Sequence, residues 1–357
     1  MLEFLYEYGL FLAKSLTIVA AIVVVVALVA SMQQRGRREE SGHLEVINLN
    51  DRLRHASDTL KQAILTGDAL KAEQKAKKKA DKESAKAAKR EAKNGSSDEK
   101  RRPRLFVLDF LGDIQASAVT GLREEITAVL EVASGNDEVL IRLESPGGLV
   151  HSYGLAASQL RRIRNRAVTL TVAVDNVAAS GGYMMACIAD RIIAAPFAVL
   201  GSIGVAAQVA NVHNLLKKND VEVDVLTAGE YKRTLTTFGE NTEAGREKFI
   251  EELEDVHTLF KDFVADNRAS VNVDEVSTGE AWYGTRALER HLVDELQTSD
   301  EFIVARSADY DVYAVRFIEH KTRVEKLLDQ LETGVKGLTG FADIRPDLLL
   351  RNSKRGI

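Results

Sequence analysis

Cysteine, proline and tryptophan are scarce in this sequence. The single cysteine, Cys187, excludes an intramolecular disulfide framework and any zinc site built from cysteines. With 4 prolines and 24 glycines in 357 residues, a collagen-like or proline-rich fibrous protein is excluded as well. Hydrophobic residues make up 45% of the chain and charged residues 28%, so most of the chain can form a buried core.

Charge is distributed unevenly along the chain. Residues 1–104 contain 21 Lys and Arg against 14 Asp and Glu, a net charge of +7. The remaining residues contain 27 against 39, a net charge of −12. An acidic body argues against nucleic acid as a partner of the globular part.

One uncharged stretch, residues 15–34, is long enough to cross a membrane, because 20 helical residues rise about 30 Å. Glu3 and Glu7 precede it where a signal peptide would carry positive charge, and no good Ala-x-Ala site ends it. We therefore expect an uncleaved single-pass anchor in residues 1–35. Residues 36–104 form a basic spacer of low complexity, helical or disordered, which is either a plain tether or a segment attracted to acidic lipid headgroups.

Alternating strands and helices are predicted from residue 105 onward. Strands are expected at 105–109, 139–143, 168–174, 191–195 and 221–226, and helices at 122–132, after the Gly-Gly turn to about 164, at 182–189 and at 242–268. This alternation predicts an α/β layered fold with parallel strands. No motif is evident after about residue 306.

Two small-residue motifs in this body can carry chemistry. Residues 144–148, Glu-Ser-Pro-Gly-Gly, lie between a strand and a helix, where backbone N–H groups can bind an anion or a developing oxyanion. Ser180 lies in Ala-Ser-Gly-Gly-Tyr, at another strand-to-helix junction. Each motif taken alone also fits a tight turn or a helix cap.

A serine nucleophile needs a base that accepts its proton. Among the seven histidines only His151, directly after the Gly-Gly turn, is a rival for this role. The other candidate is Lys232, in Glu-Tyr-Lys-Arg-Thr. An exposed lysine is almost fully protonated near pH 7, and burial against apolar groups makes a lysine a usable base.

Four motifs, in their order along the chain, resemble the S49 peptidase family of signal peptide peptidase A and protease IV. They are Ser-Pro-Gly-Gly, Ala-Ser-Gly-Gly-Tyr, Gly-Ser-Ile-Gly and Glu-Tyr-Lys-Arg-Thr. The anchor and basic region before a single peptidase domain are closest to its SohB branch. The resemblance implies a Clp-protease/crotonase-like fold of repeated β-β-α units. It divides the chain into the anchor, an S49 N-terminal region at 36–104, the peptidase domain at 105–305 and a C-terminal extension at 306–357.

The resemblance also implies roles for individual residues. Ser180 matches the nucleophile, Lys232 the general base and Ser202 the serine that holds the lysine amine. Backbone N–H groups of Gly147, Gly148 and Gly181 match the oxyanion hole. One departure is His291, which stands before Leu-Val-Asp where the family usually has glycine; losing it costs about 1 kcal/mol if the backbone there is left-handed.

The expected activity is therefore that of a membrane-anchored serine endopeptidase with a Ser–Lys dyad. It needs no metal or organic cofactor, and it acts on hydrophobic peptides such as signal peptides or membrane-protein fragments. Its expected partners are the lipid bilayer and further copies of itself. Two alternatives remain: a crotonase-like acyl-CoA enzyme, for which Glu144 could supply an acid or base, and an inactive scaffold of the same fold.

The expected location is the bacterial inner membrane, and two arguments conflict about the side that the body occupies. Arg35, Arg37 and Arg38 follow the predicted anchor, whereas only Lys14 precedes it closely, which favours a cytoplasmic body. Members of the resembling family are linked in some branches with the outer face of this membrane.

Overall fold

The computed structural model describes residues 6–19, 42–68 and 101–319, together with residues 75, 79, 82 and 86. The chain divides into two compact units, residues 44–317 and residues 1–43 with 318–357. Residues 6–19 of the second unit are helical. Within the described ranges no helix is both long and apolar enough to cross a membrane; the predicted anchor at 15–34 lies largely outside them.

A seven-stranded sheet forms the centre of the larger unit. Its strand order is β1 (Gly42–Asn48), β10 (Asp311–Glu319), β2 (Arg104–Leu111), β3 (Glu138–Glu144), β4 (Thr169–Val174), β6 (Arg191–Ala194) and β9 (Glu295–Leu296). From β10 to β9 every neighbouring pair is parallel. The fold is thus a mixed α/β fold with a parallel sheet, as the alternation of elements predicts.

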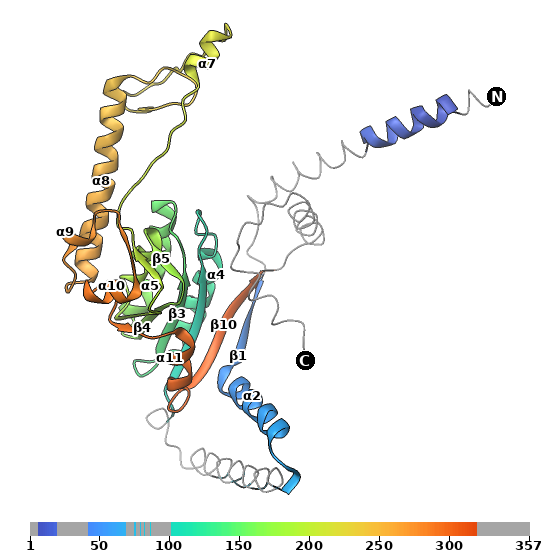
Figure 1. Ribbon diagram of the computed structural model, residues 1–357, viewed down its shortest axis with the longest axis vertical. Coiled ribbons are helices and arrows are strands. Elements are labelled where there is room, and N and C mark those ends of the chain that lie inside the picture. Colours follow the sequence, from blue (N-terminus) through green and yellow to red (C-terminus); the bar gives the residue numbers. More distant parts are fainter. Residues whose placement is uncertain are drawn as a thin grey trace. The chain divides into compact units, whose positions relative to one another are not determined.

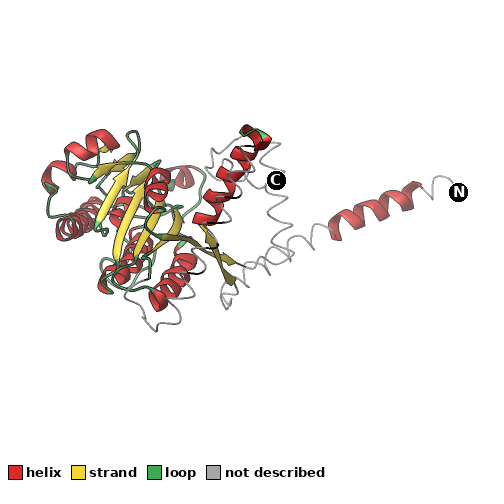
Figure 2. Ribbon diagram, turned by 90° about the horizontal axis from the view of Figure 1, so that it is seen from below, coloured by secondary structure: helices red, strands yellow, loops and turns green. Residues whose placement is uncertain are grey.

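Both faces of this sheet are buried, which explains the continuous apolar strands. In β2, Phe106 and Phe110 belong to one hydrophobic cluster, and Leu105 and Val107 belong to a second cluster. Helices cover the sheet on its two sides (Figure 2). Residues of α4 (Val119–Val132), α5 (Val150–Asn165) and α6 (Gly181–Ala186) join the first cluster, and α11 (Ser299–Arg306) joins the second. The other helices near the body are α2 (Leu49–Ile64), α9 (Val273–Val276) and α10 (Gly284–Glu289).

A second, three-stranded sheet positions the candidate site. It has the order β5 (Val177–Ala179), β7 (Val199–Gly201) and β8 (Ala281–Tyr283), with β5 and β7 parallel and β7 and β8 antiparallel. The chain enters β5 directly after β4 and enters β7 directly after β6. The pairs β4–β5 and β6–β7 thus repeat the same arrangement, a strand of the main sheet followed directly by a strand of the small sheet, and both pairs end at the same edge of the small sheet.

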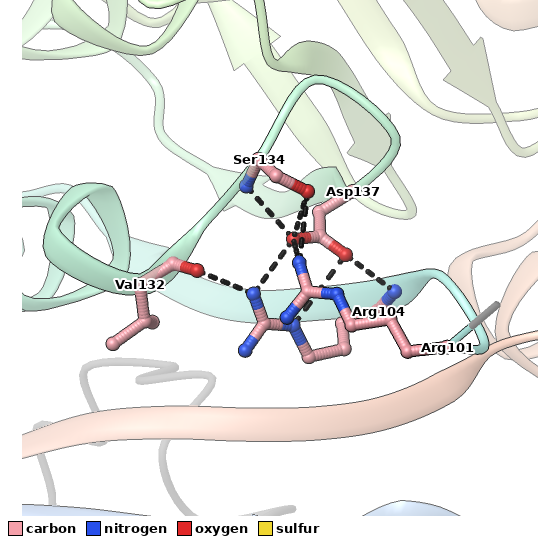
Figure 3. Close-up of polar contacts among 5 residues, drawn as sticks. All are labelled: Arg101, Arg104, Val132, Ser134 and Asp137. Atoms are coloured by element: carbon pink, nitrogen blue, oxygen red, sulfur yellow. Dashed lines mark hydrogen bonds and ion pairs between the residues drawn. The ribbon is translucent and has the colours of Figure 1, made fainter. Parts of the chain in front are cut away.

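The beginning of the parallel sheet is fixed by one buried carboxylate. Asp137 is 1% exposed and accepts hydrogen bonds from Arg101, Arg104 and Ser134, as Figure 3 shows. Arg104 also donates to the carbonyl of Val132. Burial alone raises the pKa of Asp137, but the donors from Arg104 and Ser134 outweigh it and lower the pKa below its ordinary value.

Residues between β7 and α8 (Glu243–Asn267) form an arm that runs to the far end of α8 (Figure 1). The arm contains only one short helix, α7 (His213–Lys218). In α8 only Phe260 and Val264 are buried, so the C-terminal half of this helix joins the core and the N-terminal half accompanies the arm. The arm exposes several apolar side chains: Leu215, Val221, Val225, Leu226, Tyr231 and Phe238.

Three expectations about secondary structure differ from the observed fold. Residues 42–48, expected to belong to a helical or disordered spacer, form strand β1 at the edge of the main sheet. The predicted strand at 221–226 is wrong: these residues are irregular, because they lie on the arm, where no described strand pairs with them. Strand β10 was not expected, although it pairs with β2 inside the main sheet. The predicted strands at 105–109, 139–143, 168–174 and 191–195 and the predicted helices at 122–132 and 242–268 are observed as β2, β3, β4, β6, α4 and α8.

Candidate active site

Ser180 occupies a strained turn between β5 and α6. Its backbone has φ 51° and ψ −118°, a conformation that L residues rarely adopt and that costs roughly 1–3 kcal/mol. The Ser180 side chain does not cap α6, and among the described residues its hydroxyl has no hydrogen-bond partner. The side chain is half-buried. A helix-capping role therefore does not explain this hydroxyl.

Ser202 lies beside Ser180 at the end of the neighbouring strand. Ala179 of β5 pairs with Gly201 of β7, and the Ser180 N–H donates to the Gly201 carbonyl at 2.8 Å. Neighbouring strands are about 4.8 Å apart, so the two serines follow adjacent strand ends. Ser202 repeats the unusual backbone of Ser180 with φ 51°, and its N–H donates to the Glu280 carbonyl at 2.6 Å.

The Ser-Pro-Gly-Gly turn is pressed against Ser180. A Cβ added to Gly147, which has φ 92°, would come within 2.7 Å of the Ser180 Cβ and 2.9 Å of the Gly181 nitrogen. A Cβ on Gly148 would overlap the carbonyl oxygen of Ile114. Only glycine therefore allows the turn to approach this closely from both sides.

Buried hydroxyls hold the turn from behind. Ser145 Oγ lies 2.5 Å from Tyr153 Oη and accepts the Gly147 N–H at 3.0 Å. Tyr153 Oη donates to the Asp113 carbonyl at 2.7 Å. Burial is the main cause that raises the pKa of Tyr153, so the phenol keeps the proton that this bond requires.

This network changes the set of candidate oxyanion donors. The Gly147 N–H is already donated to Ser145, so it is not free to bind an oxyanion. The N–H groups of Gly148 and Gly181 have no acceptor in the described part of the chain. Two free donors thus remain next to Ser180, which is the number that an oxyanion hole commonly uses.

Lys232 is not brought to the two serines within the described part of the chain. It is exposed on the arm, and no contact joins it to Ser180 or Ser202. The adjacent Tyr231 ring lies 5.1 Å from the Lys248 Nζ near the start of α8. Lys248 precedes the core residue Phe260 by about 12 residues, which is about 18 Å along the helix.

The other candidate groups are placed less favourably for catalysis. His151 is exposed on the first turn of α5. Glu144 accepts a hydrogen bond from the Asn176 side chain at 2.9 Å. Cys187 is fully buried, and this burial raises the pKa of its thiol to about 12, so it is not a nucleophile.

Tyr153 and Asp113, which support the turn from other elements, are not predicted from the sequence. Tyr153 lies three residues after the first residue of α5, and Asp113 lies in the loop after β2. Nothing in the local sequence distinguishes Tyr153 from an ordinary core tyrosine. A short spacing from the Gly-Gly turn was the one available signal.

Two domain families match the chain. The Peptidase family S49 N-terminal domain matches residues 3–160, and the Peptidase family S49 domain matches residues 162–312. The chain is 50% identical over 331 residues to the probable protease SohB of Haemophilus influenzae, covering 92% of this chain and 94% of the relative. It is 47% identical over 306 residues to the probable protease SohB of Buchnera aphidicola subsp. Schlechtendalia chinensis, covering 85% and 100%.

Among solved structures, a mutant of the 1510-N membrane-bound stomatin-specific protease in complex with a substrate peptide is 14% identical. The match covers 64% of this chain and 98% of that chain with a TM-score of 0.40. The two domain matches and the relatives named probable proteases identify the chain as a peptidase. The chain belongs to peptidase family S49, and its most extensive similarity among the relatives above is to the SohB probable proteases.

Proposed function

We propose that this chain is a membrane-anchored serine endopeptidase in which Ser180 is the nucleophile and Lys232 the general base. The observation that carries the proposal is the strained Ser180 turn, whose free hydroxyl lies beside the unpaired N–H groups of Gly148 and Gly181. Strain at a residue with no structural hydrogen bond is typical of a reactive group. The proposed fold family is Clp-protease/crotonase-like, in agreement with the repeated strand pairs that end at Ser180 and Ser202.

The proposed reaction proceeds through an acyl-enzyme. The neutral Lys232 amine accepts the proton of Ser180 Oγ as this oxygen attacks the peptide carbonyl carbon. The N–H groups of Gly148 and Gly181 stabilise the oxyanion of the tetrahedral intermediate. The C–N bond then breaks, the leaving amine takes the proton from Lys232, and the same lysine amine activates water to release the acyl group.

Lys232 must be delivered to Ser180, because it is exposed on the arm of a single copy. We expect a homo-oligomer in which the arm of one copy reaches the site of another. The exposed apolar side chains of the arm support a docking role for this segment. In this proposal Ser202, at the strand end next to Ser180, accepts a hydrogen bond from the arriving lysine amine.

Mixing two inactive variants tests this arrangement. Ser180→Ala and Lys232→Ala chains, unfolded apart and assembled together, should regain peptidase activity, because some sites then combine an intact serine with an intact lysine. Mixing Ser180→Ala with Ser202→Ala is the matched control and should regain little, since both serines belong to one site. Equal recovery in both mixtures would contradict delivery by a second copy.

The proposed substrates are apolar peptides, such as signal peptides or fragments of membrane proteins. Apolar side chains beside the Gly-Gly turn are exposed, among them Ile114, Leu149 and Val150. Purified wild type should cleave casein or a signal peptide, whereas Ser180→Ala should not. If the chain were an inactive scaffold, wild type would cleave neither casein nor the signal peptide. If it were an acyl-CoA enzyme, wild type would turn over enoyl-CoA, and Glu144→Gln would lower that activity.

The proposed location is a single-pass anchor in the bacterial inner membrane. The positive charges after residue 34 favour a cytoplasmic body. A full-length fusion to alkaline phosphatase, which is active only after export, should therefore be inactive. A fusion with strong phosphatase activity would place the body on the outer side instead.

A further inference from the structure

We propose that Tyr153 is the positioning residue of the oxyanion hole: its side chain holds both N–H donors, Gly148 through its hydroxyl and Gly181 through its ring. This inference rests on the proposed peptidase function. Tyr153 is 0% exposed and lies on α5, away from the strands that carry the two serines. It touches no reacting atom in the proposed mechanism, so its role is exerted through the backbone that it supports.

The direction of each hydrogen bond at the Tyr153 hydroxyl is determined. The carbonyl of Asp113 can only accept, so the single phenolic proton is donated to it. Ser145 Oγ, 2.5 Å away, must then donate its own proton to Tyr153 Oη. The lone pairs of Ser145 Oγ accept the Gly147 N–H. These hydrogen bonds fix the Pro146–Gly147 peptide, one residue before the Gly148 N–H, which has no acceptor in the described part of the chain.

The ring of Tyr153 supports the second donor. A Cβ added to Gly181 would overlap the Tyr153 ring, so the backbone of Gly181 lies directly on it. A Cβ on Gly112 would come within 2.5 Å of the Tyr153 Oη and of Ser145 Oγ. Phe110 packs edge-on against the same ring, with 6.4 Å between the ring centroids. The tyrosine is therefore enclosed on several sides and cannot shift without moving one of the two donors.

The spacing between the two donors decides how well they stabilise an oxyanion. Removing one oxyanion donor typically lowers kcat about 100- to 1,000-fold, and a displacement near 1 Å can cost about 100-fold. Tyr153→Phe keeps the ring and loses the hydroxyl. The Ser145 hydroxyl and the Asp113 carbonyl then lack their partner, and the turn is free to move away from Gly181.

The experiment compares peptide hydrolysis and fluorophosphonate labelling of Ser180 in the full-length wild type and two matched variants. Tyr153→Phe should lower kcat and the labelling rate at least 10-fold and leave KM within about twofold, because substrate binding does not use the hydroxyl. Tyr183→Phe is the control: Tyr183 is also fully buried, and its hydroxyl also donates to a backbone carbonyl, that of Leu292, at 3.0 Å. Tyr183→Phe should retain kcat within about twofold.

Ser145→Ala provides a second route to the same answer. It should lower kcat like Tyr153→Phe, and the double variant should be little worse than either, because both changes break one chain of hydrogen bonds. A normal kcat in Tyr153→Phe would overturn the inference. If Tyr153→Phe does not fold, a normal kcat in Ser145→Ala would overturn it. An equal loss in Tyr183→Phe would also overturn it. Wild type that is never labelled at Ser180 would instead overturn the proposed function on which the inference rests.

Discussion

Replacing Ser180 by glycine should abolish peptidase activity and at the same time stabilise the fold relative to Ser180→Ala. The backbone of Ser180, at φ 51° and ψ −118°, is unfavourable for any residue with a Cβ and favourable for glycine. Such strain costs roughly 1–3 kcal/mol. Glycine loses about 0.4–1 kcal/mol more chain entropy on folding than alanine.

The net expectation is that Ser180→Gly exceeds Ser180→Ala by about 1 kcal/mol in the free energy of unfolding. Guanidinium unfolding of the full-length variants, followed by circular dichroism, measures this difference. Ser158→Gly against Ser158→Ala is the matched control, since Ser158 is exposed in the helix α5. There the glycine variant should be the less stable one, by roughly 0.5–1 kcal/mol.

A Ser180→Gly chain less stable than Ser180→Ala would show that the backbone of Ser180 is not strained. Under the proposed function, a strained Ser180 is an unfavourable backbone maintained at the position of the nucleophile. The same comparison at Ser202, which has φ 51° as well, should give the same sign.

Three further predictions concern stability. Burial raises the pKa of Glu125 from 4.5 to about 7. The stability contributed by the neutral carboxyl group is therefore fully present below about pH 4.5 and is lost as the pH rises through about 7. Between pH 4 and pH 8 the free energy of unfolding of wild type should fall by about 3 kcal/mol relative to Glu125→Gln, measured by urea unfolding. Asp137→Asn should lower the free energy of unfolding by about 2–3 kcal/mol at pH 7, and the difference should shrink when acid protonates the carboxylate of wild type. His291 has φ 59°, a left-handed conformation that favours glycine, so His291→Gly should raise the free energy of unfolding by about 1 kcal/mol and with it the melting temperature. A lower melting temperature would contradict the left-handed assignment.

The parallel core could be predicted from sequence because its signals are local. The strands observed as β2, β3 and β4 are rich in apolar residues, since both faces of the sheet are covered, and each ends near a glycine-rich or polar turn. The left-handed backbone at His291 was also foreseeable, because glycine is usual at that position in the resembling family.

Other features depend on contacts that no local pattern contains. Residues 221–226 alternate like a strand, yet they lie on the arm without a pairing partner among the described strands. The strand character of β10 became decisive only through its register with β2, about 200 residues earlier. Tyr153 became recognisable as a support only when the chain placed Ser145, Asp113 and Gly181 around it.

The family resemblance predicts that Ser180 pairs with Lys232. In a single copy Lys232 is exposed and has no contact with Ser180, so the pairing requires assembly with another copy. The two residues belong to different parts of the body, one at the edge of the small sheet and the other on the arm. A base that arrives only on assembly would keep isolated copies inactive. Peptidase activity should therefore rise with protein concentration more steeply than in direct proportion, and it should increase toward alkaline pH, where a lysine base loses its proton.

The most direct test of the dyad is intact-mass and peptide-mass analysis of the assembled full-length protein after reaction with a fluorophosphonate. One adduct per chain is expected, located on Ser180. It should be absent from Ser180→Ala and form at least 100-fold more slowly in Lys232→Ala, because the base that activates the hydroxyl is missing. An adduct on Ser202 instead, or labelling of Lys232→Ala at the rate of wild type, would contradict the assignment of Ser180 as nucleophile and Lys232 as its base.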